Sequence, residues 1–140
     1  MLRPFEVLLH APSMAARVAE LGHAIRFDSG LSDADRELVT LATGRARACS
    51  FIWGSHLEAA REAGIGPEVL ETLQSGEGNL DSRRAALVSL VRELCSTGEV
   101  ADETFRAVHE LVGTRGVVEL VLTVGYYSML ATTMGAVEAC

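Results

Sequence analysis

Helical spacing of apolar residues along almost the whole chain is the feature that most restricts its fold. Between positions 12 and 29, for example, Met14, Val18, Leu21 and Ile25 recur every three to four residues, which places them on one side of a helix. No segment shows the alternation of apolar and polar residues, bounded by turn signals, that indicates strands. We therefore expect an all-α fold of about six to seven helices.

Proline, glycine and capping residues predict where these helices begin and end. Pro12 suits a first helical turn, Gly30 ends that segment, and Ser32 can cap the next helix. Gly64 and Gly76 supply similar stops further along the chain. The predicted helices cover residues 12–29, 33–47, 49–63, 67–75, 82–97 and 103–112, and a last one runs from 115 towards 139.

Composition predicts one globular domain over residues 1–140. Hydrophobic residues make up 49% of the chain and charged residues 22%, which is ordinary for a packed fold.

The net charge of −7 opposes binding to nucleic acid or to an anionic membrane. Three cysteines do not suggest a disulfide framework, and the N-terminus lacks the features of a signal peptide, so we expect a cytoplasmic protein.

The segment from Val117 to Val137 is long and apolar enough to resemble a membrane span. Glu119 and Gly125 interrupt it, and no basic cluster flanks it, so we interpret it as a buried helix. Its apolar residues occupy nearly all angular positions around the helix, and one packed face in a chain of this size cannot cover them. The segment therefore predicts an obligate homo-oligomer.

The residues with the most evident chemistry are Glu37, Cys49 and His56. Cys49 and His56 are seven residues apart, nearly two helical turns, so they share a face but lie about 10 Å apart along the axis. If the helices on either side of Arg47 and Ala48 form an antiparallel hairpin, Glu37 comes level with His56. A carboxylate beside an imidazole sets its tautomer and raises its basicity, as a general base requires.

Cys49 lies at the predicted start of a helix and close to Arg45 and Arg47, which would favour its thiolate. We therefore expect it to be the most reactive cysteine, provided that it is accessible. The two arginines could bind a small anion, and Trp53 could form a wall of the site. The alternative is structural: a buried cysteine and histidine serve packing, and the arginines are solvated charges at a helix end.

The stretch from Arg36 to Leu73 resembles the signature region of the carboxymuconolactone decarboxylase family. Its segments RELV, ACSFIWGSH, AAREAGI and EVLETL follow in the family's order, and ELVLTVGYYSML resembles the closing helix. The resemblance implies the helical fold of alkyl hydroperoxidase D, catalytic roles for Glu37, Cys49 and His56, and a trimer or hexamer. Members that resemble alkyl hydroperoxidase D carry two cysteines three apart, whereas this chain has Ile52 at the second position and Phe51 where those members have an extra histidine.

The function expected from these observations is a decarboxylase-like enzyme that acts on a small anionic carbonyl or lactone acid. It would use acid/base chemistry without a cofactor or a metal, with Arg45, Arg47 and Trp53 as substrate-binding candidates. One alternative is a thiol peroxidase with a single active cysteine, which needs Cys95, Cys140 or an external thiol to resolve a sulfenic acid. A second alternative is a helical oligomer without catalytic activity.

Overall fold

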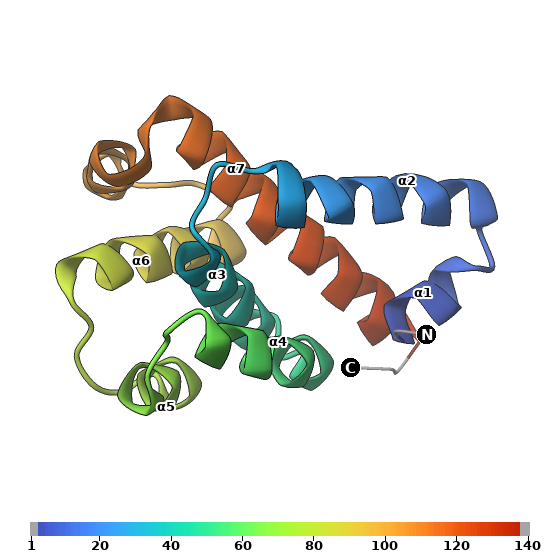
Figure 1. The fold of residues 1–140 in the computed structure, drawn as a ribbon, viewed down its shortest axis with the longest axis horizontal. Coiled ribbons are helices and arrows are strands. Elements are labelled where there is room, and N and C mark those ends of the chain that lie inside the picture. Colours follow the sequence, from blue (N-terminus) through green and yellow to red (C-terminus); the bar gives the residue numbers. More distant parts are fainter. Residues whose placement is uncertain (1–2, 138–140) are drawn as a thin grey trace.

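The computed structural model describes residues 3–137, and in that part of the chain every regular element is a helix. Figure 1 shows these helices crossing one another around a shared interior, with the long α7 running diagonally through the molecule. This confirms the predicted all-α class. The elements are α1 (Arg3–Leu8), α2 (Pro12–His23), the π-helical turn η1 (Ala24–Asp28), α3 (Asp33–Ala46), α4 (Ser50–Glu62), α5 (Pro67–Ser75), α6 (Ser82–Ser96) and α7 (Asp102–Ala136).

The predicted boundaries of the central helices agree closely with the structure. Ser32 caps α3 by accepting a hydrogen bond from the backbone N–H of Asp35 at 3.1 Å. Asp81 caps α6 in the same way through the N–H of Arg84, at 3.0 Å. Gly76 ends α5 in the left-handed conformation, with a φ of 77°.

Two N-terminal elements differ from the prediction. The helix α1 was not predicted, because six residues are too few to show a helical period; it packs against α2 and α7, and Pro4 in its first turn is buried. The helix expected over residues 12–29 keeps α-helical geometry only to His23 and continues as the π-helical turn η1.

The last two predicted helices together form α7, which a break at Gly113 divides into two segments. Gly113, with a φ of 70° and a ψ of 179°, interrupts the helical geometry of α7 and separates residues 102–112 from 114–136. The predicted helices 103–112 and 115 onward agree with this division, while residues 138–139 lie outside the described part of the chain. α7 is long and apolar enough to cross a membrane, and 44% of its most apolar window is buried inside the protein.

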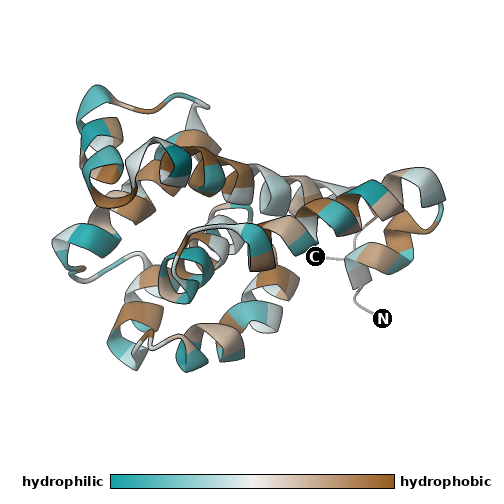
Figure 2. Cartoon of the chain, turned by 45° about the horizontal axis from the view of Figure 1, so that its top comes forward, coloured by the Kyte–Doolittle hydropathy of each residue, from teal (hydrophilic) through white to brown (hydrophobic). Residues whose placement is uncertain are grey.

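The interior consists of two hydrophobic clusters. The larger cluster joins α3, α6 and α7 and includes Leu38, Leu41, Leu87, Leu90 and Leu120, none more than 1% exposed. The colouring of Figure 2 shows apolar and polar residues sharing the same helices, as expected for helices with one buried side.

The smaller cluster joins η1, the start of α4 and the C-terminal half of α7. Its members are Ile25, Cys49, Ile52, Tyr126, Tyr127, Leu130, Ala131 and Met134. These residues form the side of the molecule on which the candidate site lies.

Candidate active site

Glu37 of α3 and His56 of α4 form a buried hydrogen-bonded pair. Oε2 of Glu37 lies 2.8 Å from Nδ1 of His56, and the two residues are 5% and 6% exposed. The predicted antiparallel hairpin of α3 and α4 accounts for this contact, and the expected hydrogen-bonding distance is confirmed. When Glu37 is ionised, Nδ1 of His56 carries a hydrogen and donates a hydrogen bond to the carboxylate.

The hairpin turn is built by close backbone packing. Ala48 has a φ of 51°, the left-handed region, and the N–H of Cys49 donates to the carbonyl of Gly44 at 2.9 Å. A Cβ at Gly44 would lie 2.9 Å from Cγ2 of Ile52 and 3.3 Å from the backbone nitrogen of Trp53. Glycine at position 44 therefore allows the approach of α4 to α3.

The second oxygen of Glu37 faces an arginine. Nε of Arg36 lies 3.7 Å from Oε1 of Glu37, and Nη2 of the same guanidinium pairs with Asp33 at 3.0 Å. Arg36 also donates from Nη1 to the backbone carbonyl of Arg26, at 3.1 Å. This contact connects η1 to the start of α3, beside the Glu37–His56 pair.

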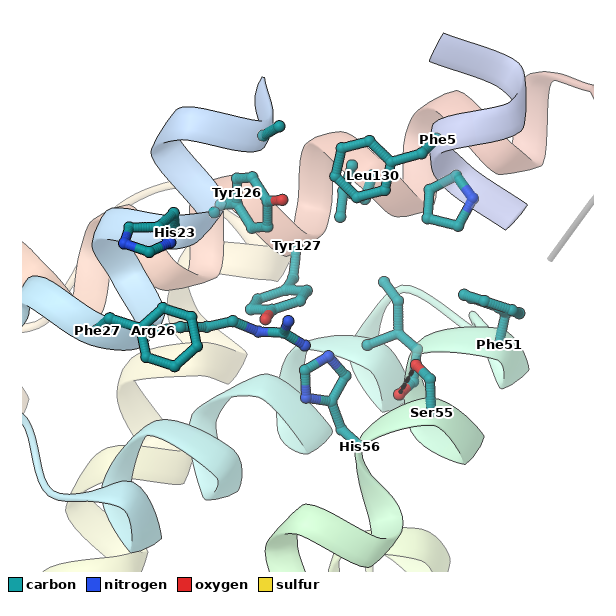
Figure 3. A pocket seen from close by; sticks show the side chains of 14 residues that line it. Phe5, His23, Arg26, Phe27, Phe51, Ser55, His56, Tyr126, Tyr127 and Leu130 are labelled. Atoms are coloured by element: carbon teal, nitrogen blue, oxygen red, sulfur yellow. Dashed lines mark hydrogen bonds between the residues drawn. The ribbon is translucent and has the colours of Figure 1, made fainter. Parts of the chain in front are cut away.

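His56 lines an apolar cavity of about 190 Å³. Nε2 of His56 forms no hydrogen bond with any residue in the described part of the chain, so it remains able to exchange a proton with a ligand. Figure 3 shows side chains from α1, η1, α4 and α7 around this space. The lining consists of Pro4, Phe5, Ala19, Gly22, His23, Arg26, Phe27, Phe51, Ile52, Ser55, His56, Tyr126, Tyr127 and Leu130.

Two tyrosines of α7 form one wall of the cavity. The ring of Tyr127 packs edge-on against the ring of His56, with centroids 5.0 Å apart, and against Tyr126 at the same separation. Burial raises the pKa of both tyrosines, and for Tyr127 the nearby Arg26 guanidinium opposes this rise. A Cβ at Gly22 would collide with the hydroxyl of Tyr126, so glycine at position 22 leaves room for this ring.

Cys49 lies outside the His56 cavity, which differs from the predicted grouping. It is the N-cap residue of α4, only 1% exposed, and it borders a separate pocket together with Arg45 and Trp53. Cys49 is disulfide-bonded, so its sulfur is not a thiolate in this state, and the accessibility on which its predicted reactivity depended is not met. Among the described residues Cys95 is the free cysteine; the suggested resolving residue Cys140 lies outside them.

The predicted substrate-binding residues Arg45, Arg47 and Trp53 are also absent from the lining of the His56 cavity. Nε of Arg45 donates to the carbonyl of Gln74 at 2.8 Å, and Nε of Arg47 donates to Oγ of Ser128 at 3.0 Å. The two arginines lie at the C-terminal end of α3, whereas Glu37 lies near its N-terminal end. They therefore bond to the neighbouring helices α5 and α7 and do not line the His56 cavity.

Sequence reasoning missed the residues that complete the cavity, notably Arg26, Tyr127 and Phe5. Arg26 lies in a segment that has an ordinary helical pattern, and its orientation depends on the π-helical turn. Tyr127 lies within the apolar run of α7, where nothing in the sequence separates a wall residue from a core residue. No group of three or more metal-ligating side chains occurs among the described residues.

Comparisons with known proteins agree with this architecture. The model of the carboxymuconolactone decarboxylase family matches residues 12–75, the region from α2 to α5 that carries Glu37 and His56. Over this region the chain is similar to the carboxymuconolactone decarboxylase family. No curated protein matches the sequence significantly.

A solved structure has the same fold over nearly the whole chain. The crystal structure of an Agrobacterium tumefaciens protein of unknown function, provisionally assigned as the antioxidant defence protein AhpD, superposes with a TM-score of 0.81. The two proteins are 15% identical, and the match covers 95% of this chain and 93% of the other.

Cys49 is not part of a Cys-x-x-Cys pair. Ile52 occupies the position three residues after Cys49; it is 2% exposed and packs in the smaller hydrophobic cluster. A disulfide between positions 49 and 52 is therefore impossible.

Proposed function

We propose that this protein is a carboxymuconolactone decarboxylase-like enzyme that acts on a small carbonyl or lactone acid by acid/base chemistry without a cofactor. The observation that carries the proposal is the buried hydrogen bond between Glu37 and His56 at the edge of an apolar cavity. His56 is the catalytic residue, and Glu37 is the positioning residue that sets its tautomer and stabilises its protonated form.

The proposed step breaks the bond between the substrate's ring carbon and its carboxylate. The electron pair of that bond moves into the adjacent carbonyl system, which becomes an enolate as CO₂ leaves. Nε2 of His56, protonated at the start, then delivers its proton to carbon, and water restores the proton. The apolar lining favours departure of the neutral CO₂ and keeps bulk water from the enolate.

The test is CO₂ release from carboxymuconolactone and related lactone acids by the wild type and three variants. We expect His56→Asn to lower kcat by about 10²- to 10⁴-fold, the range for a lost general acid. Glu37→Gln should also lower kcat and change the pH profile, because the neutral amide cannot stabilise an imidazolium. Cys49→Ser should retain activity, since Cys49 does not line the cavity. Unchanged turnover in His56→Asn would exclude the proposed mechanism.

A second candidate, a thiol-dependent antioxidant oxidoreductase, is favoured by the disulfide bond of Cys49. Peroxide would oxidise the reduced thiolate to a sulfenic acid, and a second thiol would condense with it to a disulfide and water. Hydrogen peroxide consumption, in the presence of an added dithiol, should then disappear in Cys49→Ser and persist in His56→Asn. This result, together with no CO₂ release by the wild type, would favour the oxidoreductase over the lyase.

A further inference from the structure

The lining of the His56 cavity combines several aromatic side chains with one strong cation. Five phenylalanine and tyrosine side chains contribute to it, from four different elements: Phe5, Phe27, Phe51, Tyr126 and Tyr127. Among the described side chains of the lining, Arg26 is the one that carries a permanent charge. Arg26 forms no ion pair with a carboxylate in the described part of the chain.

The backbone of Arg26 is hydrogen-bonded to a residue beside the Glu37–His56 pair. It lies in the middle of η1, and π-helical turns occur frequently at functional sites because they reorient a side chain within a helix. Its carbonyl accepts a hydrogen bond from Arg36, the residue before Glu37, at 3.1 Å. Figure 3 shows the guanidinium of Arg26 extending from η1 into the space between Tyr127 and His56.

We propose that Arg26 binds the carboxylate of a planar one-ring acid whose ring packs between the aromatic side chains of this cavity. A guanidinium presents two parallel N–H donors to a carboxylate, and aromatic rings stack favourably on other flat rings. The volume of about 190 Å³ suits a single ring, since an apolar cavity of roughly 150 Å³ binds benzene. Such an acid would lie next to Nε2 of His56.

A planar one-ring acid would be the substrate class of the enzyme proposed above. Its turnover depends on that proposed function, but its binding by Arg26 does not, because binding involves no reaction step. Arg26 takes the role that the sequence assigned to Arg45 and Arg47. The reason is position: both of those arginines bond to neighbouring helices, whereas Arg26 faces the cavity.

The experiment is isothermal titration of the intact protein with three probes: benzoate, the neutral isostere benzamide, and the ringless acid acetate. We expect benzoate to bind, and benzamide and acetate to bind at least about tenfold more weakly, because each lacks one of the two recognised features.

Variants then test Arg26 directly. Arg26→Gln should weaken benzoate binding by about 10- to 100-fold, the range for a hydrogen bond to a charged group. Arg26→Lys should weaken it less, because it keeps the charge but loses the two-pronged geometry. Arg17→Gln on α2 is the matched control: it removes an exposed arginine outside the cavity and should leave binding unchanged. Circular dichroism checks that each variant is folded.

Failure of this inference is distinguishable from failure of the proposed function. No benzoate binding by the wild type at millimolar concentration, equal binding by Arg26→Gln, or equal binding of benzamide would overturn the role of Arg26. CO₂ release that depends on His56 would stand regardless of those results. Conversely, benzoate binding that requires Arg26 supports the inference even where His56→Asn has no effect on turnover.

Discussion

Several buried polar side chains have hydrogen-bond partners, which lets the apolar interior tolerate them. Glu37 and His56 bond to each other, and the hydroxyls of Thr40, Thr43 and Thr123 donate to the carbonyl four residues earlier in their own helices. Removing one member of the Glu37–His56 pair leaves a buried atom of the other without its hydrogen bond, which is costly. The catalytic variants proposed above therefore keep a polar group at each position.

Tyr126 and Tyr127 predict a loss of stability in alkali. Burial raises the folded pKa of each tyrosine above its ordinary value of about 10. Such a group contributes to the free energy of unfolding. This contribution is fully present below the pKa that the group has in the unfolded chain, and it is lost as the pH rises through the pKa that it has in the folded protein. We expect the free energy of unfolding in urea to fall above pH about 10, and Tyr127→Phe to make that fall shallower. An equally steep fall in Tyr127→Phe would contradict this prediction.

The cysteines should react in the order opposite to that expected from the sequence. Cys49 is disulfide-bonded and 1% exposed, whereas Cys95 is free and partly exposed. We therefore expect iodoacetamide to label Cys95 in the native protein before Cys49, both with and without prior reduction, as measured by peptide mass spectrometry. Faster labelling of Cys49 after reduction would show that its pocket opens, and would strengthen the thiol oxidoreductase hypothesis.

At the scale of elements, the hairpin of α3 and α4 is the unit that brings Glu37 and His56 together. The turn between the helices places residues nineteen positions apart within hydrogen-bonding distance. It depends on the positive φ of Ala48 and on the absence of a side chain at Gly44. The close approach of the two helices is therefore a property of a few backbone positions.

A pair of glycine substitutions tests this dependence. Gly44→Ala should destabilise the protein by about 1–3 kcal/mol, because its Cβ would overlap Ile52 and the backbone of α4. Gly54→Ala, in the middle of α4, meets nothing within 4 Å and should stabilise by about 0.5–1 kcal/mol through the better helix propensity of alanine. Urea unfolding midpoints measure both changes. Equal effects of the two substitutions would mean that the approach at Gly44 is not tight.

At the scale of the whole molecule, α7 carries an exposed apolar stripe on the single chain. Val118, Val121, Leu122 and Met129 recur at helical spacing and are between 38% and 54% exposed. A contiguous apolar surface of this kind is typical of an interface. We propose that it is covered by a second copy of the chain, in a homo-oligomer as the sequence predicts.

Leu122→Lys tests the oligomer. A lysine within an apolar interface loses its hydration without gaining a partner, so we expect the variant to dissociate towards monomers in sedimentation velocity at micromolar concentration. Phe105→Lys is the control, because Phe105 is similarly exposed, 47% against 49%, but lies in the other segment of α7, before the Gly113 break. A wild type that sediments as a monomer would refute the oligomer and return attention to a membrane role for α7.

Much of this architecture follows from the sequence by itself. Apolar spacing and capping residues predict the helices from α2 to α7, and they place the turn between α3 and α4 closely enough to pair Glu37 with His56. This succeeds because the pair belongs to one hairpin, in which helical rise and a short turn determine the position of each side chain. The absence of a cysteine at position 52 is likewise visible in the sequence.

Only the tertiary structure determined what surrounds that pair. Arg26, Phe5 and Tyr127 reach the cavity from elements far apart in the chain, while Cys49 and Trp53, close to His56 in sequence, border another pocket. The physical reason is that apolar periodicity specifies which side of a helix is buried, but not which other helix covers it. The orientation of Arg26 depends further on a π-helical turn whose sequence pattern is that of an ordinary helix.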